Sequence, residues 1–252
     1  MGRVSNRYEL KLIRQSGVIV AKALKAALEA IKPGLSGLEV DKIATQEIYK
    51  QGGDLSYKSV PGYKFATCIT VNEQVVHGIP TDRKFEYGDL VSVDLAVVYK
   101  GWHTDCAWSV LVGESKEQKK KKFLKVGERA LWNGVKYAVD GGRVGDISCA
   151  IQTEVEGGGY SVVRSLVGHG VGRSLHEDPE IPGFGEKGTG ASLKSGMSLA
   201  IEVIYAAGLP DLLIEADRWT YRTVDKSLGG LFEMTVIVGK DEPEILTDWR
   251  KD

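Results

Sequence analysis

Five acidic or imidazole side chains lie at positions where a charged or titratable group calls for a functional explanation. They are Asp94, Asp105, His169, Glu202 and Glu233. Four of them lie inside apolar runs that favour β-structure, where a lone carboxylate facing a core would cost several kcal/mol unless it were paired or bound to a metal. Carboxylates and imidazole are ligands that divalent cations accept. The set therefore predicts a dinuclear metal site.

Two of these carboxylates are predicted to share one face of a β-hairpin. The segments LVSVDLAVV and WHTDCAWSV are separated by YKG. If the two residues between Tyr99 and Trp102 form the loop, Asp94 lies opposite Ala107 and diagonal to Asp105. Uncompensated carboxylates so placed repel each other, and a divalent cation between them removes that conflict. The alternative for either residue alone is an Asp on a solvent-facing strand.

The histidines favour chemistry by their surroundings. His169 stands between Gly168 and Gly170, where a tight backbone can bring an imidazole close to a ligand. Taken alone, it could equally be an ordinary hydrogen-bonded histidine. However, three of the four histidines, His77, His169 and His176, stand beside glycine or in mixed polar loops. That distribution predicts a functional role for them.

Composition predicts one catalytic domain, residues 1–252, acting as a cytoplasmic monomer. The chain has 42% hydrophobic and 27% charged residues and a formal net charge of −1, which gives no reason to expect DNA or a membrane as partner. It has no apolar run of about 18 residues and no signal-peptide region. Its three cysteines include no CxxC pair, so we expect reduced thiols.

Helical and strand-like segments follow one another twice. Apolar spacing predicts helices over 6–31 and 119–139, each followed by a glycine loop and a second helix, within 32–53 and 140–159, and then by strands. Gly34 and Gly37 recur as Gly142 and Gly145, an offset of 108 residues. This order predicts a duplicated unit.

These motifs resemble the type I methionine aminopeptidases, which share the pita-bread fold with prolidases, proline-specific aminopeptidases and creatinase. The resemblance runs from Tyr8 to Val238. It includes ITVNEQVVHGIP, GHGVGRSLHEDPEIPGFG and DRWTYRTVDKSLGG, in addition to the four carboxylate-bearing segments. It implies an α+β fold in which helices flank a curved antiparallel sheet, with a pseudo-two-fold internal symmetry that a duplicated unit would suit. The implied reaction is removal of the N-terminal methionine from nascent polypeptides, preferring a small second residue.

The same resemblance assigns the site residues. It implies that all five predicted ligands bind two divalent ions, Mn, Fe(II) or Co, with Asp105 and Glu233 bridging. It implies catalytic roles for His77, His176 and Glu202, the last also a metal ligand. The residues that it places around the substrate are His77, Tyr63, Cys68, Leu175, His176 and Trp219. For the aromatic residues, Leu175 and Cys68, packing in the core is the alternative.

Some positions depart from the family pattern. Val203 follows Glu202 where these enzymes usually carry Pro, Met234 follows Glu233 where they usually carry His, and Cys106 follows Asp105 where a hydroxyl residue is common. No predicted ligand is lost. Because neighbours on a strand point to opposite faces, we expect Val203 and Met234 to be packing residues.

The run KEQKKKK, residues 116–122, is the one charge run. It predicts a solvated first turn of a helix, and a transient contact with ribosomal RNA is the alternative.

Two other functions compete with the aminopeptidase. Prolidases and proline-specific aminopeptidases usually carry an additional N-terminal domain, which 252 residues leave no room for. A binding-only relative of the fold would be expected to have lost ligands, and none is lost.

Overall fold

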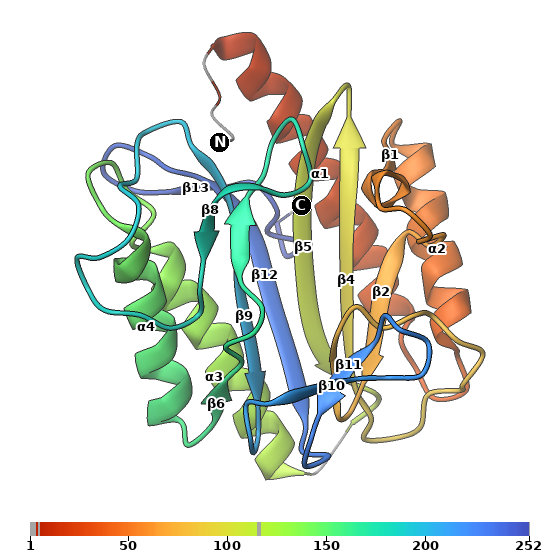
Figure 1. The fold of residues 1–252 in the computed structure, drawn as a ribbon. Helices are drawn as coiled ribbons and strands as arrows, with labels where there is room; N and C mark the ends of the chain where they lie inside the picture. The colour runs from red at the N-terminus through yellow and green to blue at the C-terminus, as the bar shows by residue number, and fades with distance from the viewer. Residues whose placement is uncertain (1–3, 5, 115–116, 252) are drawn as a thin grey trace.

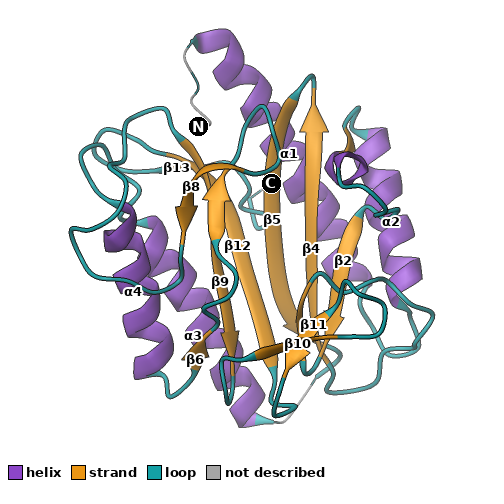
Figure 2. Cartoon of the chain, viewed as in Figure 1, coloured by secondary structure: helices purple, strands orange, loops and turns teal. Residues whose placement is uncertain are grey.

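A curved antiparallel sheet with helices on one face dominates the computed structural model, which describes residues 4, 6–114 and 117–251 (Figures 1 and 2). The α+β prediction is confirmed. Four α-helices lie in the described part of the chain: α1 (Arg7–Ala30), α2 (Gly37–Lys50), α3 (Gln118–Val135) and α4 (Val144–Gly157). None of the helices in the described residues is long and apolar enough to cross a membrane.

Local sequence signals set where the first two helices begin. The Asn6 side chain accepts hydrogen bonds from the backbone N–H groups of Tyr8 and Glu9, so it caps α1. Ser36 and Glu39 form a capping box at the start of α2. Both helices direct apolar residues at the sheet, and burying these residues supplies most of their stability.

The main sheet has the strand order β1-β4-β5-β12-β9-β7-β8, with β2, β6 and β13 paired at the side of this path. Its long members are β4 (Leu90–Tyr99), β5 (Trp102–Leu111), β9 (Ser198–Ala206) and β12 (Gly229–Ile237). The short ones are β1 (Asp54–Leu55), β2 (Thr67–Val71), β6 (Ser161–Val162), β7 (Gly168–Gly170), β8 (Glu177–Ile181) and β13 (Glu244–Ile245). A second sheet pairs β10 (Leu212–Ile214), β11 (Tyr221–Thr223) and β3 (Gln74–Val76).

The predicted hairpin register is confirmed. Tyr99 pairs with Trp102, and Asp94 pairs with Ala107. Lys100 and Gly101 have φ angles of 49° and 77°, the left-handed backbone that a two-residue hairpin turn needs. The hairpin therefore places both aspartates on one face of the sheet.

The internal repeat is present, with one correction. Gly34 donates its N–H to Phe85 and Gly141 donates to Leu193, both with φ above 80°. Gly34 therefore matches Gly141, an offset of 107 residues, and α2 and α4 begin at Gly37 and Val144, the same offset apart. The predicted matches of Gly34 to Gly142 and of Gly37 to Gly145 are each wrong by one position. The glycine pattern alone misled because Gly141 and Gly142 are adjacent and only the backbone angle tells them apart.

The core fills the space between the sheet and the helices. Cys106, Val203 and Met234, the three departures from the family pattern, are fully buried there. Cys106 and Met234 are cross-strand partners on neighbouring strands. The prediction that Val203 and Met234 are packing residues is therefore confirmed, and their side chains face away from the predicted ligands.

Candidate metal centre

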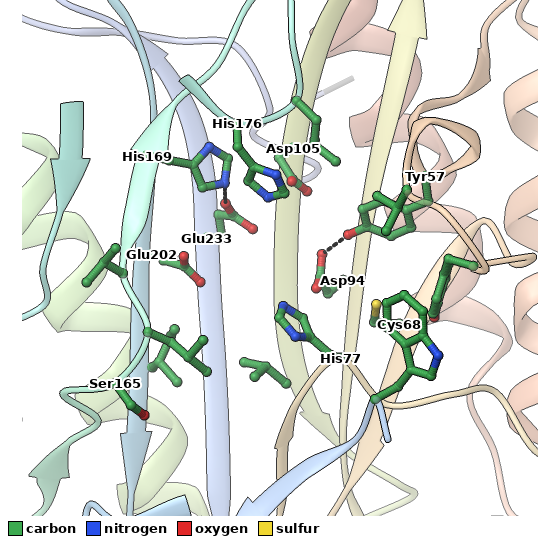
Figure 3. Close-up of a pocket in the computed structure, with 18 residues that line it drawn as sticks. Tyr57, Cys68, His77, Asp94, Asp105, Ser165, His169, His176, Glu202 and Glu233 are labelled. Carbon is green, nitrogen blue, oxygen red and sulfur yellow. Dashed lines mark hydrogen bonds and ion pairs between the residues drawn. The ribbon is translucent and has the colours of Figure 1, made fainter. Parts of the chain in front are cut away.

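The five predicted ligands lie on five adjacent strands of the main sheet. In the order β4, β5, β12, β9 and β7 they are Asp94, Asp105, Glu233, Glu202 and His169. Figure 3 shows them pointing into one cavity on the face of the sheet opposite the helices. The sheet alone thus forms a row of donors from residues that are far apart in sequence.

Strand register explains why these side chains meet. Glu233 pairs with Ala107 on one side and with Glu202 on the other. Asp105 is two residues from Ala107 and so shares its face. His169 pairs with Ala200, two residues from Glu202. Every predicted ligand therefore projects to the same side.

Three of the ligands already approach the geometry of a metal site. One donor atom from each of Asp105, His169 and Glu233 lies within 4.8 Å of the other two. The His169 Nε2 atom is 4.0 Å from a Glu233 oxygen. His169 Nδ1 lies 2.9 Å from the Gly170 carbonyl oxygen, which leaves Nε2 facing the cavity. Asp105 Oδ1 is buried without a hydrogen-bond partner, as expected of an atom that a cation satisfies.

Burial makes the site costly without a cation. It raises the pKa of Glu202 to about 8, with a further contribution from Asp94, and the pKa of Asp94 to about 6. Burial, and then the neighbouring carboxylates, hold the pKa values of Asp105 and Glu233 well above the usual range. Burial lowers the pKa of His169 to about 4, so its ring is neutral and able to ligate. The donor set fits divalent ions that prefer oxygen ligands.

His77 and His176 stand on opposite sides of the cavity. The His176 ring lies 4.5 Å from that of His169, centroid to centroid, and the His77 ring lies 5.7 Å from that of Tyr221. His77 has a φ of 55°, an unusual angle for a non-glycine residue, of the kind that clusters at functional sites. Burial lowers the pKa of both histidines, which favours neutral rings.

The cavity has a volume of about 310 Å³ and is largely apolar on one side. All eleven residues predicted for the site line it. Of the four predicted around the substrate side chain, Tyr63, Cys68 and Leu175 are buried in one cluster, and the partly buried Trp219 packs against it. The rings of Tyr63 and Trp219 are 5.1 Å apart. Burial raises the pKa of the Cys68 thiol, so it remains protonated.

Sequence reasoning missed Tyr57 and Val60, which line the same wall. The Tyr57 hydroxyl donates a hydrogen bond of 2.6 Å to Asp94 Oδ1. The segment SYKSVPGY carries no periodic pattern, and its aromatic residues around a Pro-Gly pair were the one available signal.

Comparison with known proteins agrees with this geometry. Residues 11–240 match the model of metallopeptidase family M24. The chain is 44% identical over 239 residues to methionine aminopeptidase 1 of Bacillus subtilis, covering 95% of this chain and 96% of that protein. It matches the crystal structure of methionine aminopeptidase from Thermotoga maritima with a TM-score of 0.94 and 40% identity, over 98% and 99% of the two chains. A prolidase from Pyrococcus furiosus shares the fold, with a TM-score of 0.76 at 24% identity, over 98% of this chain and 65% of the prolidase.

Proposed function

Because the chain belongs to metallopeptidase family M24, we propose that its cavity is the site where the peptide bond after an N-terminal methionine is hydrolysed. The activity is that of a methionyl aminopeptidase, and its substrates are the N-termini of polypeptides. One observation carries the assignment to this cavity: the row of five ligands opens directly onto an apolar pocket.

Two divalent ions fit the row of donors. The strand order supports Asp105 and Glu233 as the bridging ligands, because β5 and β12 are the middle two of the four strands that carry carboxylates. Asp94 then completes one ion site, and His169 with Glu202 completes the other. Four carboxylates and one imidazole favour Mn, Fe(II) or Co over a thiolate-type zinc site.

Glu202 is the proposed proton carrier. When bound, the two ions supply an activated water and polarise the scissile carbonyl. Glu202 takes the proton from the water and delivers it to the leaving amine. Its position supports this role, since Glu202 lines the cavity beside Glu233, its cross-strand partner.

The two histidines outside the ligand row act on the substrate. His176, close to His169, donates a ring N–H to the oxyanion that develops on the carbonyl. His77, across the cavity, positions the scissile peptide or its leaving nitrogen. Neither needs a positive charge for this, and burial lowers the pKa of both.

The apolar wall selects the methionine side chain. Tyr63, Cys68, Leu175 and Trp219 are the proposed contacts, and they are largely or fully shielded from solvent where they face the cavity. A preference for a small second residue is part of the same proposal. In this proposal the second side chain lies beside His77 and His176, which both line the cavity.

Nascent chains in the cytoplasm are the proposed physiological substrates of this monomer. The charge run supports a transient ribosomal contact, because Lys119, Lys121 and Lys122 are exposed at the start of α3, as predicted. Lys116 lies outside the described residues. Lys120 differs because it donates to the Gly88 carbonyl at 2.6 Å and so helps fix the helix start.

Initial rates on Met-Ala-x and Xaa-Pro peptides test the proposal. Metal-stripped protein is assayed after addition of Mn, Fe(II), Co or Zn, and the released amino acid is identified. We expect release of methionine from Met-Ala-x peptides and none from Xaa-Pro peptides. Cleavage of Xaa-Pro peptides alone would favour the prolidase alternative, and no cleavage with any metal would favour a binding-only protein.

A further inference from the structure

Tyr57 touches a predicted ligand without belonging to the ligand row. It lies in η1 (Ser56–Ser59), a 3-10 turn that precedes the substrate wall. Its ring lines the cavity and its side chain is 8% exposed. Its hydroxyl donates to Asp94 Oδ1 at 2.6 Å, as the dashed line in Figure 3 shows. The ring therefore faces the substrate pocket and the hydroxyl faces the metal centre.

The turn that carries Tyr57 is joined to β5 and closed by a hydrogen bond of its own. Ser56 Oγ is 2.6 Å from His103 Nδ1 on β5, and Ser59 Oγ donates to the Ser56 carbonyl at 2.8 Å. The Tyr57 ring packs edge-on against Tyr63, with centroids 5.5 Å apart. These contacts fix the ring, so the hydroxyl is held at one point beside Asp94.

Among the carboxylates of the donor row, Asp94 is the one that a tyrosine hydroxyl holds. It lies at one end of the donor row, and it is outside the group formed by Asp105, His169 and Glu233. A carboxylate rotates freely about its terminal bond unless something fixes it. One O–H bond to Oδ1 fixes the rotation and leaves Oδ2 and a lone pair of Oδ1 free for an ion.

We propose that Tyr57 is a positioning residue. Its hydroxyl orients Asp94 toward the metal ion that this carboxylate would bind, and its ring forms part of the methionine pocket. The inference rests on the dinuclear centre of the proposed function. Partners of metal ligands typically change metal affinity by about 10–100-fold when they are removed. Loss of the Tyr57 hydroxyl should therefore weaken one of two binding steps and leave the other unchanged.

Calorimetric titration of metal-stripped protein with Co²⁺ tests this. Wild type should bind two ions. Tyr57→Phe should weaken the weaker step about tenfold, and excess Co²⁺ should restore most of kcat. Tyr63→Phe is the matched control, because this neighbouring buried tyrosine donates instead to the Thr67 carbonyl, at 2.7 Å. It should keep both Co²⁺ affinities, whatever it does to KM.

The outcomes separate this inference from the proposed function. A wild-type protein that binds fewer than two Co²⁺ ions overturns the dinuclear centre and Tyr57's role with it. Two ions in wild type with unchanged or tighter binding in Tyr57→Phe overturn the inference alone, as does equal weakening in Tyr63→Phe.

If the Tyr57→Phe variant folds poorly, the double variant Tyr57→Phe/Asp94→Asn can replace it in the test, because it buries no unpaired charge at this point. It should bind Co²⁺ as Asp94→Asn does. A further loss of affinity in the double variant would show that Tyr57 acts on the metals by another route.

Discussion

We expect the metal-free protein to lose stability as the pH rises from about 6.5 to 8. Burial raises the pKa of Glu202 from 4.5 to about 8, so below pH 8 the folded chain holds a proton that the unfolded chain has released. Stability then falls with rising pH until the folded pKa is passed. Each pH unit over which the two states differ by one proton is worth about 1.4 kcal/mol, so between pH 6.5 and 8 Glu202 alone contributes a loss of about 2 kcal/mol.

The pH window follows from the opposing groups. The pKa of Asp94 is raised to about 6, which lowers stability as pH rises to about 6. The pKa of His169 is lowered from 6.5 to about 4, which raises stability over nearly the same range, because the unfolded chain is the one that binds the proton. These two effects largely cancel. Above pH 6.5 neither of these effects acts. The raised pKa values of Glu202, Asp105 and Glu233 then determine how stability changes with pH.

Thermal unfolding of chelator-treated protein between pH 6.5 and 8 measures the effect. Tm should fall with rising pH, and saturating Mn²⁺ should abolish the fall, since ligand carboxylates are already ionised when they hold an ion. Glu202→Gln is the matched control, because an amide does not titrate, and its metal-free form should show a shallower slope. Equal slopes with and without Mn²⁺, or an unchanged slope in Glu202→Gln, would refute the reasoning.

Three substitutions test individual residues of the proposed centre. Asp105→Asn should remove metal and activity together, while the control Lys121→Ala, on the exposed face of α3, should keep both. If metal analysis found the Asp105→Asn protein fully loaded and it was active, the bridging role would be contradicted. His176→Ala should lower kcat by roughly 10² with metal content little changed, and loss of metal instead would make it a ligand. Cys68→Leu overfills the substrate wall and should cost about 1–3 kcal/mol in kcat/KM for Met-Ala-x peptides. Unchanged kcat/KM would place Cys68 outside the pocket.

Residues whose geometry depends on near neighbours were predictable from sequence. The register of Asp94 and Asp105 followed from a two-residue turn, and the first helix followed from its apolar spacing. The positions of these elements relative to each other came from the family resemblance, because pairing of β5 with β12 joins residues more than 120 positions apart. Periodicity carries no information at that range.

Contacts made by irregular segments were not predictable. Tyr57 reaches Asp94 through a 3-10 turn, whose path depends on Ser56 and His103 meeting across the fold. The one-residue difference between Gly141 and Gly142 in the repeat likewise depends on a backbone angle that composition does not encode.

The internal repeat lets two copies of one unit diverge. Asp94 and Glu202 occupy matching strands, 108 residues apart, so each half supplies one outer carboxylate. In a symmetric pair of identical subunits, every substitution would alter both sides of the centre at once. In a fused chain, one half can keep Tyr63, Cys68 and an apolar wall while the other acquires His169 and its neighbouring imidazole. Joining the copies thus gives the two sides of one metal centre separate tasks, gripping a side chain and handling charge.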